Sequence, residues 1–196
     1  YYASERNDER ERQPWTNFEL RTLVEELHRN GVQAYLAIMG IELNNRFHKE
    51  WIFDHPELRY TYVDGWRYGY NFVKNFSDGR RFDEFFTSKL CRTLEDYGFA
   101  GVQTADCFCP AGQVLQMDFS SEVFNLFLAH AKLECPPDIA PRMEEEGKEV
   151  FELRRDWIRK NHLPEWIKFN AWNWAGFWKK LCSGVHAQGK KVINLG

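Results

Sequence analysis

A helix-then-strand order that occurs three times constrains the fold of this chain most. Short apolar runs at residues 32–39, 102–105 and 192–195 each follow a segment whose apolar residues recur at helical spacing. Parallel strands need a crossover between them, usually a helix, and strands covered on both faces read as continuous apolar runs. The order therefore predicts an α/β protein in which the three runs are parallel neighbours in one sheet, with their carboxyl ends at one edge.

Three amphipathic helices are predicted to precede these strands. The first begins with a capping box formed by Thr16 and Glu19, the second covers residues 80–97, and the third begins near Pro164 and ends at Gly189. One face of each helix should pack against the sheet. The side chains expected to be mostly buried on these faces are Leu20, Leu23, Val24, Leu27, Phe82, Phe85, Phe86, Leu90, Leu94, Ile167, Trp174, Trp178 and Leu181.

The remaining segments are less regular. Residues 60–63 or 68–73 could supply one more strand, and residues 120–133 have helical spacing. The length suits one domain with a sizeable core, so residues 1–196 are read as a single domain.

The composition narrows the classes of partner and cofactor. The net charge of −3 gives no electrostatic reason to expect a nucleic acid or an anionic membrane as partner. No apolar run approaches the roughly 18 residues of a membrane-spanning helix. The odd number of cysteines, without zinc-ligand spacing, favours neither a disulfide framework nor a zinc site, and His48 and His55 lack the spacing of a metal motif. We therefore expect no cofactor and no metal.

Two carboxylates follow predicted strands and are the candidate catalytic residues. Asp106 comes directly after the run at 102–105, and Glu42 follows the run at 32–39. In helix-wrapped parallel barrels the active site lies at the carboxyl ends of the strands, so both side chains could point to one rim. Each has a structural alternative, because Asp106 could cap the following turn and Glu42 could be a solvated loop residue.

Three segments together carry a resemblance to a known family. They are residues 97–110 (YGFAGVQTADCFCP), residues 154–157 (RRDW) with the tryptophans of residues 174–178, and residues 189–194 (GKKVIN). Their order resembles the bacterial glycosyl-hydrolase-like barrels of the wider retaining glycosidase group, which carry a strand of the kind Asp-Gly-Ile-His-(Phe/Leu)-Asp-Asp-Tyr-Phe-Tyr-Pro. The resemblance covers residues 75–196, and more weakly residues 16–40. Asp106 matches the second aspartate of the family's pair, and Ala105 stands in place of the first.

The resemblance implies a TIM-type (β/α)₈ barrel, of which this chain holds only a part. A complete barrel typically takes about 250 residues, and the three or four predicted strands cannot close one. The chain is therefore either part of a larger barrel protein or a small open α/β sheet. An unpaired strand at residues 192–195 would need the rest of the barrel or a second copy to cover it.

The activity implied is hydrolysis of O-glycosidic bonds of a carbohydrate by carboxylate acid/base catalysis. Candidate substrate-binding residues are Trp51, Trp66 and Trp172 as sugar platforms and Asn194 as a hydrogen-bonding group, although packing and a strand-end cap explain them as well. Two alternatives stay open. One is a non-catalytic carbohydrate-binding barrel, which Ala105 favours, and the other is a structural or interaction module.

Overall fold

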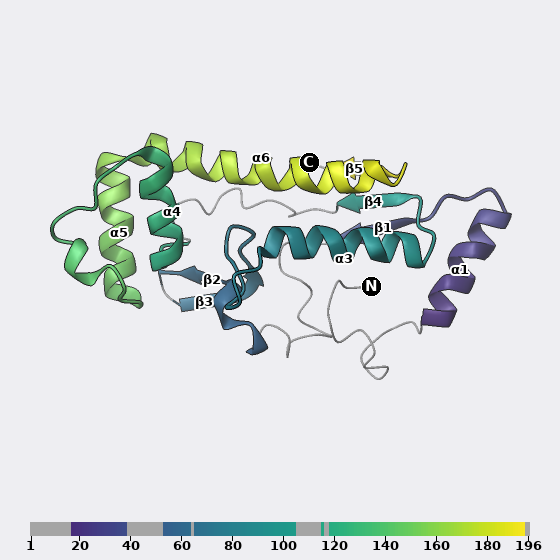
Figure 1. Cartoon of the computed structure of the whole chain (residues 1–196), viewed down its shortest axis with the longest axis horizontal. Coiled ribbons are helices and arrows are strands. Elements are labelled where there is room, and N and C mark those ends of the chain that lie inside the picture. Colours follow the sequence, from purple (N-terminus) through teal and green to yellow (C-terminus); the bar gives the residue numbers. More distant parts are fainter. Residues whose placement is uncertain (1–16, 39–52, 64, 105–114, 116–117, 195–196) are drawn as a thin grey trace.

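The computed structural model describes residues 17–38, 53–63, 65–104, 115 and 118–194. Its helices and strands run along one elongated body, with the longest helix, α6, extending over most of its length (Figure 1). In chain order the elements are α1 (Asn17–Arg29), β1 (Tyr35–Ile38), η2 (Pro56–Leu58), β2 (Arg59–Tyr62), β3 (Gly65–Tyr70), α3 (Phe82–Asp96), β4 (Gly101–Thr104), α4 (Ser121–Ala131), η3 (Ala140–Arg142), α5 (Lys148–Asn161), α6 (Leu163–Ala187) and β5 (Lys191–Asn194).

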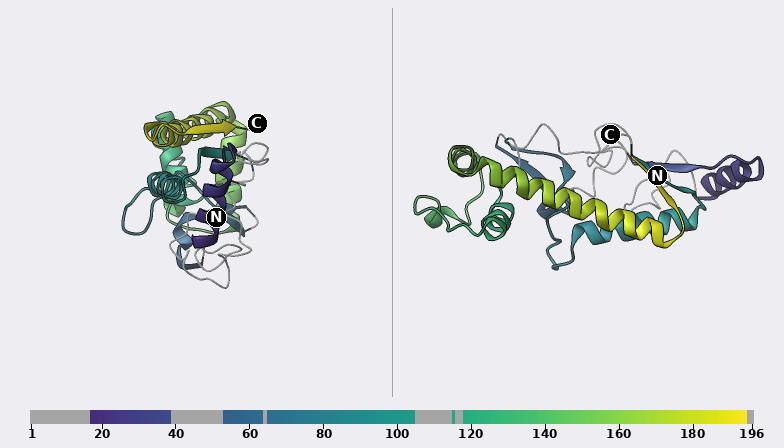
Figure 2. Two further views of the ribbon diagram at one scale, coloured as in Figure 1. Left: turned by 90° about the vertical axis from the view of Figure 1, so that its right-hand side faces the viewer. Right: turned by 90° about the horizontal axis from the view of Figure 1, so that it is seen from above.

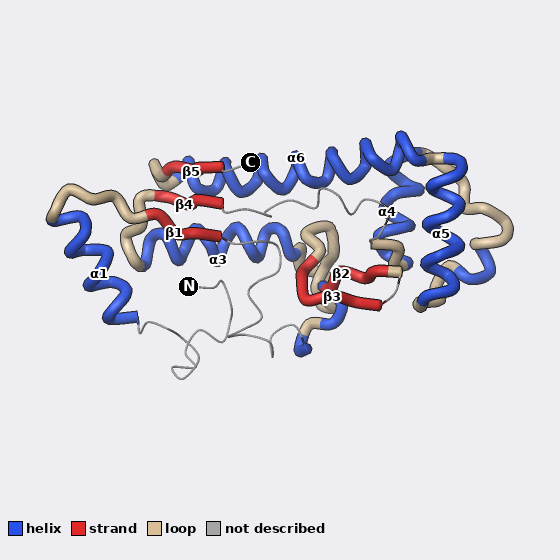
Figure 3. The backbone as a smooth tube through the Cα atoms, turned by 180° about the vertical axis from the view of Figure 1, so that it is seen from behind, coloured by secondary structure: helices blue, strands red, loops and turns tan. Residues whose placement is uncertain are grey.

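The three predicted strands form one parallel sheet in the order β1-β4-β5. Tyr35 pairs with Gly101, and Val102 in turn pairs with Val192, so the strands are in register and their carboxyl ends lie at one edge. Helices α3 and α6 lead into β4 and β5, and both lie behind the strands in Figure 3, so they cover the same face of the sheet. The prediction of parallel neighbouring strands is confirmed.

The prediction of a partial TIM-type (β/α)₈ barrel is wrong. Within the described residues the parallel sheet has three strands and is open, and the other two strands, β2 and β3, form a separate antiparallel hairpin. The physical reason lies between β4 and α6. This region builds α4, η3 and α5, whose apolar side chains pack into a helical core instead of supplying further strand–helix units. Of the two readings kept open above, the structure has the open α/β sheet, in a mostly helical protein.

Two hydrophobic cores hold the molecule together, and α6 contributes to both. One core lies between the sheet, α1, α3, the hairpin and the carboxyl-terminal half of α6, where Phe177, Leu181 and Val185 are buried. The other lies between α4, α5 and the amino-terminal part of α6, which contributes Trp166 and Phe169. Helix α6 therefore joins the two cores, and its middle turns lie at their junction (Figure 1).

The predicted buried face of α6 is wrong by one residue in its first half. Ile167 is 48% exposed, whereas its neighbour Trp166 is fully buried, and Trp174 and Trp178 are only partly buried. Trp174 and Trp178 were expected to lie at the centre of the buried face, but they lie at its border, where their side chains are partly exposed. On α1, Leu23 is likewise exposed, although Leu20 and Val24 are buried as expected. The face predicted for α3 is confirmed at Phe82, Phe86, Leu90 and Leu94.

Two glycines allow close approaches between elements. A Cβ at Gly101 would lie 2.0 Å from the carbonyl oxygen of Lys191, so β4 and β5 could not keep their spacing with any other residue there. A Cβ at Gly184 would lie 2.9 Å from Cγ2 of Thr87, which means that α3 and α6 pack closely at this point. Figure 2 shows the two helices side by side when the molecule is seen from above.

Arg154 anchors the second core from the inside. Its side chain is fully buried, and its guanidinium donates to the carbonyl oxygens of Phe119 (2.7 Å), Met143 (2.7 Å) and Glu145 (3.0 Å). Burial lowers the pKa of this arginine. The residue ties α5 to the segment before α4 and to the turn after η3, so the role of Arg154 is structural.

Candidate functional site

A groove with a volume of about 390 Å³ lies where α6 passes from one core to the other. Its walls come from the middle of α6, from α4 and from the start of α3 with the preceding loop. Gly176 leaves the α6 wall open, because a Cβ there would meet no atom within 4 Å. The volume is in the range of sites that hold small molecules. Because the groove lies at the junction of two cores, it is the first candidate for a binding site.

One part of the groove is aromatic. Phe72 stacks on Phe177 with 3.9 Å between ring centroids and an interplanar angle of 24°, and Phe169 adds a third buried ring. Trp172 also lines the groove but is 62% exposed, with its ring 4.8 Å from the ring of His130. A tryptophan this exposed is not needed to fill a core, so its flat face is available to a ligand.

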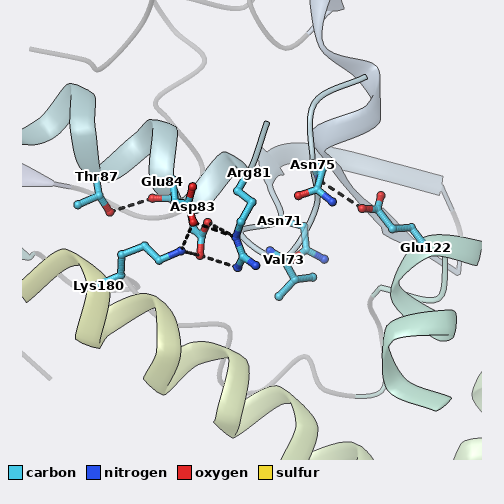
Figure 4. A network of polar contacts seen from close by, with 9 residues as sticks. All are labelled: Asn71, Val73, Asn75, Arg81, Asp83, Glu84, Thr87, Glu122 and Lys180. Atoms are coloured by element: carbon cyan, nitrogen blue, oxygen red, sulfur yellow. Dashed lines mark hydrogen bonds and ion pairs between the residues drawn. The ribbon is translucent and has the colours of Figure 1, made fainter. Parts of the chain in front are cut away.

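The other part of the groove is charged and centres on Asp83 (Figure 4). The Asp83 carboxylate accepts hydrogen bonds from Nε (3.1 Å) and Nη2 (2.9 Å) of Arg81 and from Nζ of Lys180 (2.6 Å). Its side chain is only 6% exposed. Burial alone would raise the pKa of Asp83, but the hydrogen bonds and charges of Arg81 and Lys180 outweigh it and hold the pKa below its usual value. Asp83 is therefore ionised at neutral pH.

Glu84 completes this charged cluster from the next position of α3. Its Oε1 lies 3.1 Å from Nζ of Lys180 and 3.4 Å from Nε of Arg81, and its side chain is 59% exposed. The cluster thus holds two cations and two carboxylates, one buried and one solvated. Lys180 belongs to α6, Asp83 and Glu84 to the first turn of α3, and Arg81 directly precedes α3, so the cluster also connects the two helices.

A second polar cluster lies next to the groove, and its charged side chains are buried. Asp118 accepts hydrogen bonds from Nζ of Lys74 (3.0 Å), Nδ2 of Asn71 (3.0 Å) and the backbone N–H groups of Thr61 (3.3 Å) and Ser120 (3.1 Å). Both charged side chains are at most 5% exposed. A small pocket of about 40 Å³ touches Asp118 and Asn71 and shares Phe72, Phe169 and Asn173 with the groove. The cluster joins the hairpin to the start of α4 and so supports the floor of the groove.

Glu122 has the property that an acid catalyst needs. Its pKa is raised, so its carboxyl group holds a proton more readily than an ordinary glutamate. Burial raises the pKa of Glu122, while a hydrogen bond from the backbone N–H of Asn75 (3.2 Å) and the charge of Lys74 oppose the rise. Figure 4 shows Glu122 on α4, pointing to Asn75. It does not line the groove, so the acid and the ligand-sized space are not combined in one place.

The residues predicted for the site are only partly placed by the structure. Asp106, Glu42 and Trp51 lie outside the described residues, and Trp66 belongs to β3, with its side chain outside the described part. Trp172 lines the groove, and its role as a substrate-binding residue stays a prediction. Asn194 ends β5, where its Oδ1 accepts a hydrogen bond from Oγ1 of Thr104 (2.8 Å).

Trp172 and Asn194 are not brought together. Trp172 lies about four helical turns before the end of α6, and β5 packs against the far end of that helix. The hydrogen bond of Asn194 to the neighbouring strand fits the structural alternative of a strand-end cap. A site that combined the rim of the sheet with Trp172 is therefore not formed.

No direct signal in the sequence points to Arg81, Asp83 and Lys180. The Asp83–Lys180 contact joins residues that are 97 positions apart, and charged side chains at the start of a helix are common. One hint was present, because Lys180 directly precedes the buried Leu181 within a largely apolar helix. A lysine in such a position often has a fixed partner.

Comparison with protein-family models, with characterised proteins and with solved structures finds no match for this chain. The resemblance to glycosidase barrels therefore stays a prediction from the sequence. In the described part of the chain, no helix is long and apolar enough to cross a membrane. That part also holds no group of three or more histidine, cysteine or acidic side chains able to bind a metal ion.

Proposed function

We propose that this protein is a saccharide-binding module whose ligand lies in the groove between α3, α4 and α6. The observation that carries the proposal is Trp172, which is 62% exposed and lines a groove of about 390 Å³. A sugar ring has an apolar C–H face that packs on an aromatic ring, and Trp172 offers such a platform.

The polar groups of the groove suit the other side of a sugar. Hydroxyl groups both donate and accept hydrogen bonds, and the groove combines the donors of Arg81 and Lys180 with the amide of Asn173 and the carboxylate of Asp83. A mostly apolar groove with a few fixed polar groups is typical of small-molecule sites, where the polar groups orient the ligand.

The same geometry favours binding over hydrolysis within the groove. A glycosidase needs one carboxyl group that is protonated when it meets the substrate. Asp83 is held as a carboxylate by two cations, and Glu122, whose pKa is raised by burial, does not line the groove. The groove therefore lacks the acid and base pair of a glycosidase among its described lining residues.

The proposal is tested by titrating the protein with a panel of neutral oligosaccharides and measuring binding by calorimetry and saturation-transfer NMR. Stacking on an aromatic ring contributes about 0.5–1.5 kcal/mol, so Trp172→Ala should weaken binding roughly 3- to 10-fold. Ile167→Ala is the matched control, because Ile167 is also exposed on α6 but does not line the groove. Failure of every sugar to bind the wild type, or equal binding by Trp172→Ala, would overturn the proposal.

A second candidate, glycoside hydrolysis at the edge of the sheet, is favoured by one observation. β1 and β4 are parallel neighbours, with Ile38 paired to Thr104. The carboxyl ends of β1 and β4, which precede Glu42 and Asp106 in the sequence, therefore lie at the same edge of the sheet, where α/β proteins commonly place their ligand sites. Under this proposal, Asp106→Asn and Glu42→Gln remove turnover of aryl glycosides without changing the unfolding midpoint. Absence of turnover by the wild type on glycosides of all common sugars would exclude this candidate.

A further inference from the structure

We infer that Arg81 and Lys180, at the charged end of the groove, bind the carboxylate of an acidic sugar, and that Glu84, which does not itself line the groove, pairs with these two cations in the free protein. The inference rests on the proposed saccharide-binding function and names the class of ligand. Its basis is that Arg81 and Lys180 each contact two carboxylates, Asp83 and Glu84. The two carboxylates differ in the exposure of their side chains and in the length of their contacts to the cations.

Asp83 is the permanent partner of the two cations. Its side chain is 6% exposed, it contacts Arg81 through both of its oxygens, and its distance to Nζ of Lys180 is 2.6 Å. Its position in the first turn of α3 adds the favourable field of a helix amino terminus. A ligand would have to remove a buried, multiply bonded carboxylate to take this place, and that is costly.

Glu84 is the replaceable partner. Its side chain is 59% exposed, and a single oxygen, Oε1, makes both of its contacts, at 3.1 Å and 3.4 Å. Exposed ion pairs of this kind contribute little to stability, because solvent screens them. If Glu84 turned to solvent, Arg81, Lys180 and Asp83 would leave one net positive charge at the end of the groove. A ligand with one carboxylate would restore the balance.

The spacing along α6 adds a condition on the length of the ligand. Trp172, Gly176 and Lys180 are spaced four residues apart and share one face of the helix, so the Cα atoms of Trp172 and Lys180 are separated by about 12 Å along the axis. This span exceeds one pyranose ring. The stacked ring and the acidic ring are therefore different units of one oligosaccharide that contains a uronic acid.

The test compares short uronic acid oligomers with their methyl esters, which remove the charge and keep the sugar. Trimers of galacturonate, glucuronate and mannuronate are titrated into the wild-type protein by calorimetry at low and high salt. At least one acid should bind roughly tenfold more tightly than its ester, and salt should reduce the difference. Lys180→Met should abolish the preference for the acid.

Glu84→Gln is the decisive variant, because it removes the resident competitor without removing a cation. It should raise the affinity for the preferred acid several-fold and leave the affinity for its ester unchanged. Glu95→Gln, at an exposed position of the same helix outside the groove, is the matched control and should change neither affinity.

The outcomes separate the inference from the proposed function. Equal binding of acid and ester, or no gain of affinity in Glu84→Gln, would overturn the inference and leave a neutral saccharide site in place. If neither the acids nor their esters bind, the inference fails, and the neutral oligosaccharide panel alone then decides whether the saccharide-binding proposal survives.

Discussion

Replacing Gly184 by alanine should destabilise the protein, although alanine is the better helix former. Gly184 lies in the interior of α6, where its added Cβ would be 2.9 Å from Cγ2 of Thr87 and 3.1 Å from Sγ of Cys91. Thr87 cannot turn away freely, because its Oγ1 donates a hydrogen bond to the carbonyl oxygen of Asp83 at 2.8 Å. The contact must therefore be relieved by moving α3 and α6 apart.

The magnitude follows from two opposing contributions. Glycine to alanine in a helix interior is worth about 1 kcal/mol in favour of alanine. Forcing a methyl group into a packed contact typically costs about 1–3 kcal/mol. Gly176 lies in the same helix, and a Cβ there meets no atom within 4 Å, so Gly176→Ala measures the first contribution alone. We expect Gly176→Ala to be more stable than Gly184→Ala by about 1–3 kcal/mol.

Urea unfolding followed by circular dichroism measures this difference. Thermal unfolding is a second measurement, in which a difference of 1 kcal/mol corresponds to roughly 2–4 °C in the melting temperature for a chain of this size. Adding Thr87→Ser to Gly184→Ala removes the clashing Cγ2 but keeps the hydroxyl, so it should recover part of the lost stability. If the two glycine variants are equally stable, the close approach of α3 and α6 is wrong.

Four further substitutions test the cores and the charged clusters. Phe86→Ala should cost about 3–5 kcal/mol of unfolding free energy, because Phe86 is 3% exposed within the aromatic cluster, and a near-neutral urea midpoint would contradict this packing. Lys74→Met should cost about 3 kcal/mol and Asp118→Ala about 5 kcal/mol, because only the second also leaves three further donors without their acceptor; the reverse order in denaturant titrations would refute the network. The lowered pKa of Asp83 contributes stability that is present above about pH 4, the usual range for aspartate, and is lost as the pH falls below it. Asp83→Asn should therefore be less stable than the wild type at pH 6 but lose less stability between pH 6 and pH 3, and parallel unfolding curves at the two pH values would count against the ion pairs.

The sequence was sufficient to predict the local elements of the sheet. Residues 32–39, 102–105 and 192–195 were recognisable because a buried parallel strand must be apolar and must follow a crossover helix. The structure has the three strands in the expected parallel order. β1 lies within its predicted range, and β4 and β5 each begin and end one residue earlier than predicted. Periodicity also identified α3, since its stripe of Phe82, Phe86, Leu90 and Leu94 faces a single core.

The wider architecture could not be predicted in the same way. A local resemblance around Asp106 was extended to a whole barrel, but fold depends on what every other segment does. Residues 60–63 and 68–73 overlap the two strands of one antiparallel hairpin, not a strand of the parallel sheet. The buried face of α6 was misjudged because this helix faces two different cores, so no single stripe describes its whole length.

The same property of α6 explains why the groove exists. A helix that packs into one core needs one continuous apolar face, but α6 ends one contact at Phe169 and begins the next at Phe177. Between these positions only Trp174 packs against a core, and it is partly buried, so the other positions can carry an exposed tryptophan at 172, a glycine at 176 and, just beyond Phe177, the cation Lys180. Because the α4 wall belongs to one core and the charged cluster at the start of α3 is fixed to the other, the width of the groove depends on how α6 holds the two cores apart. A ligand that binds in the groove and touches both walls would therefore also stabilise the position of the two cores relative to each other.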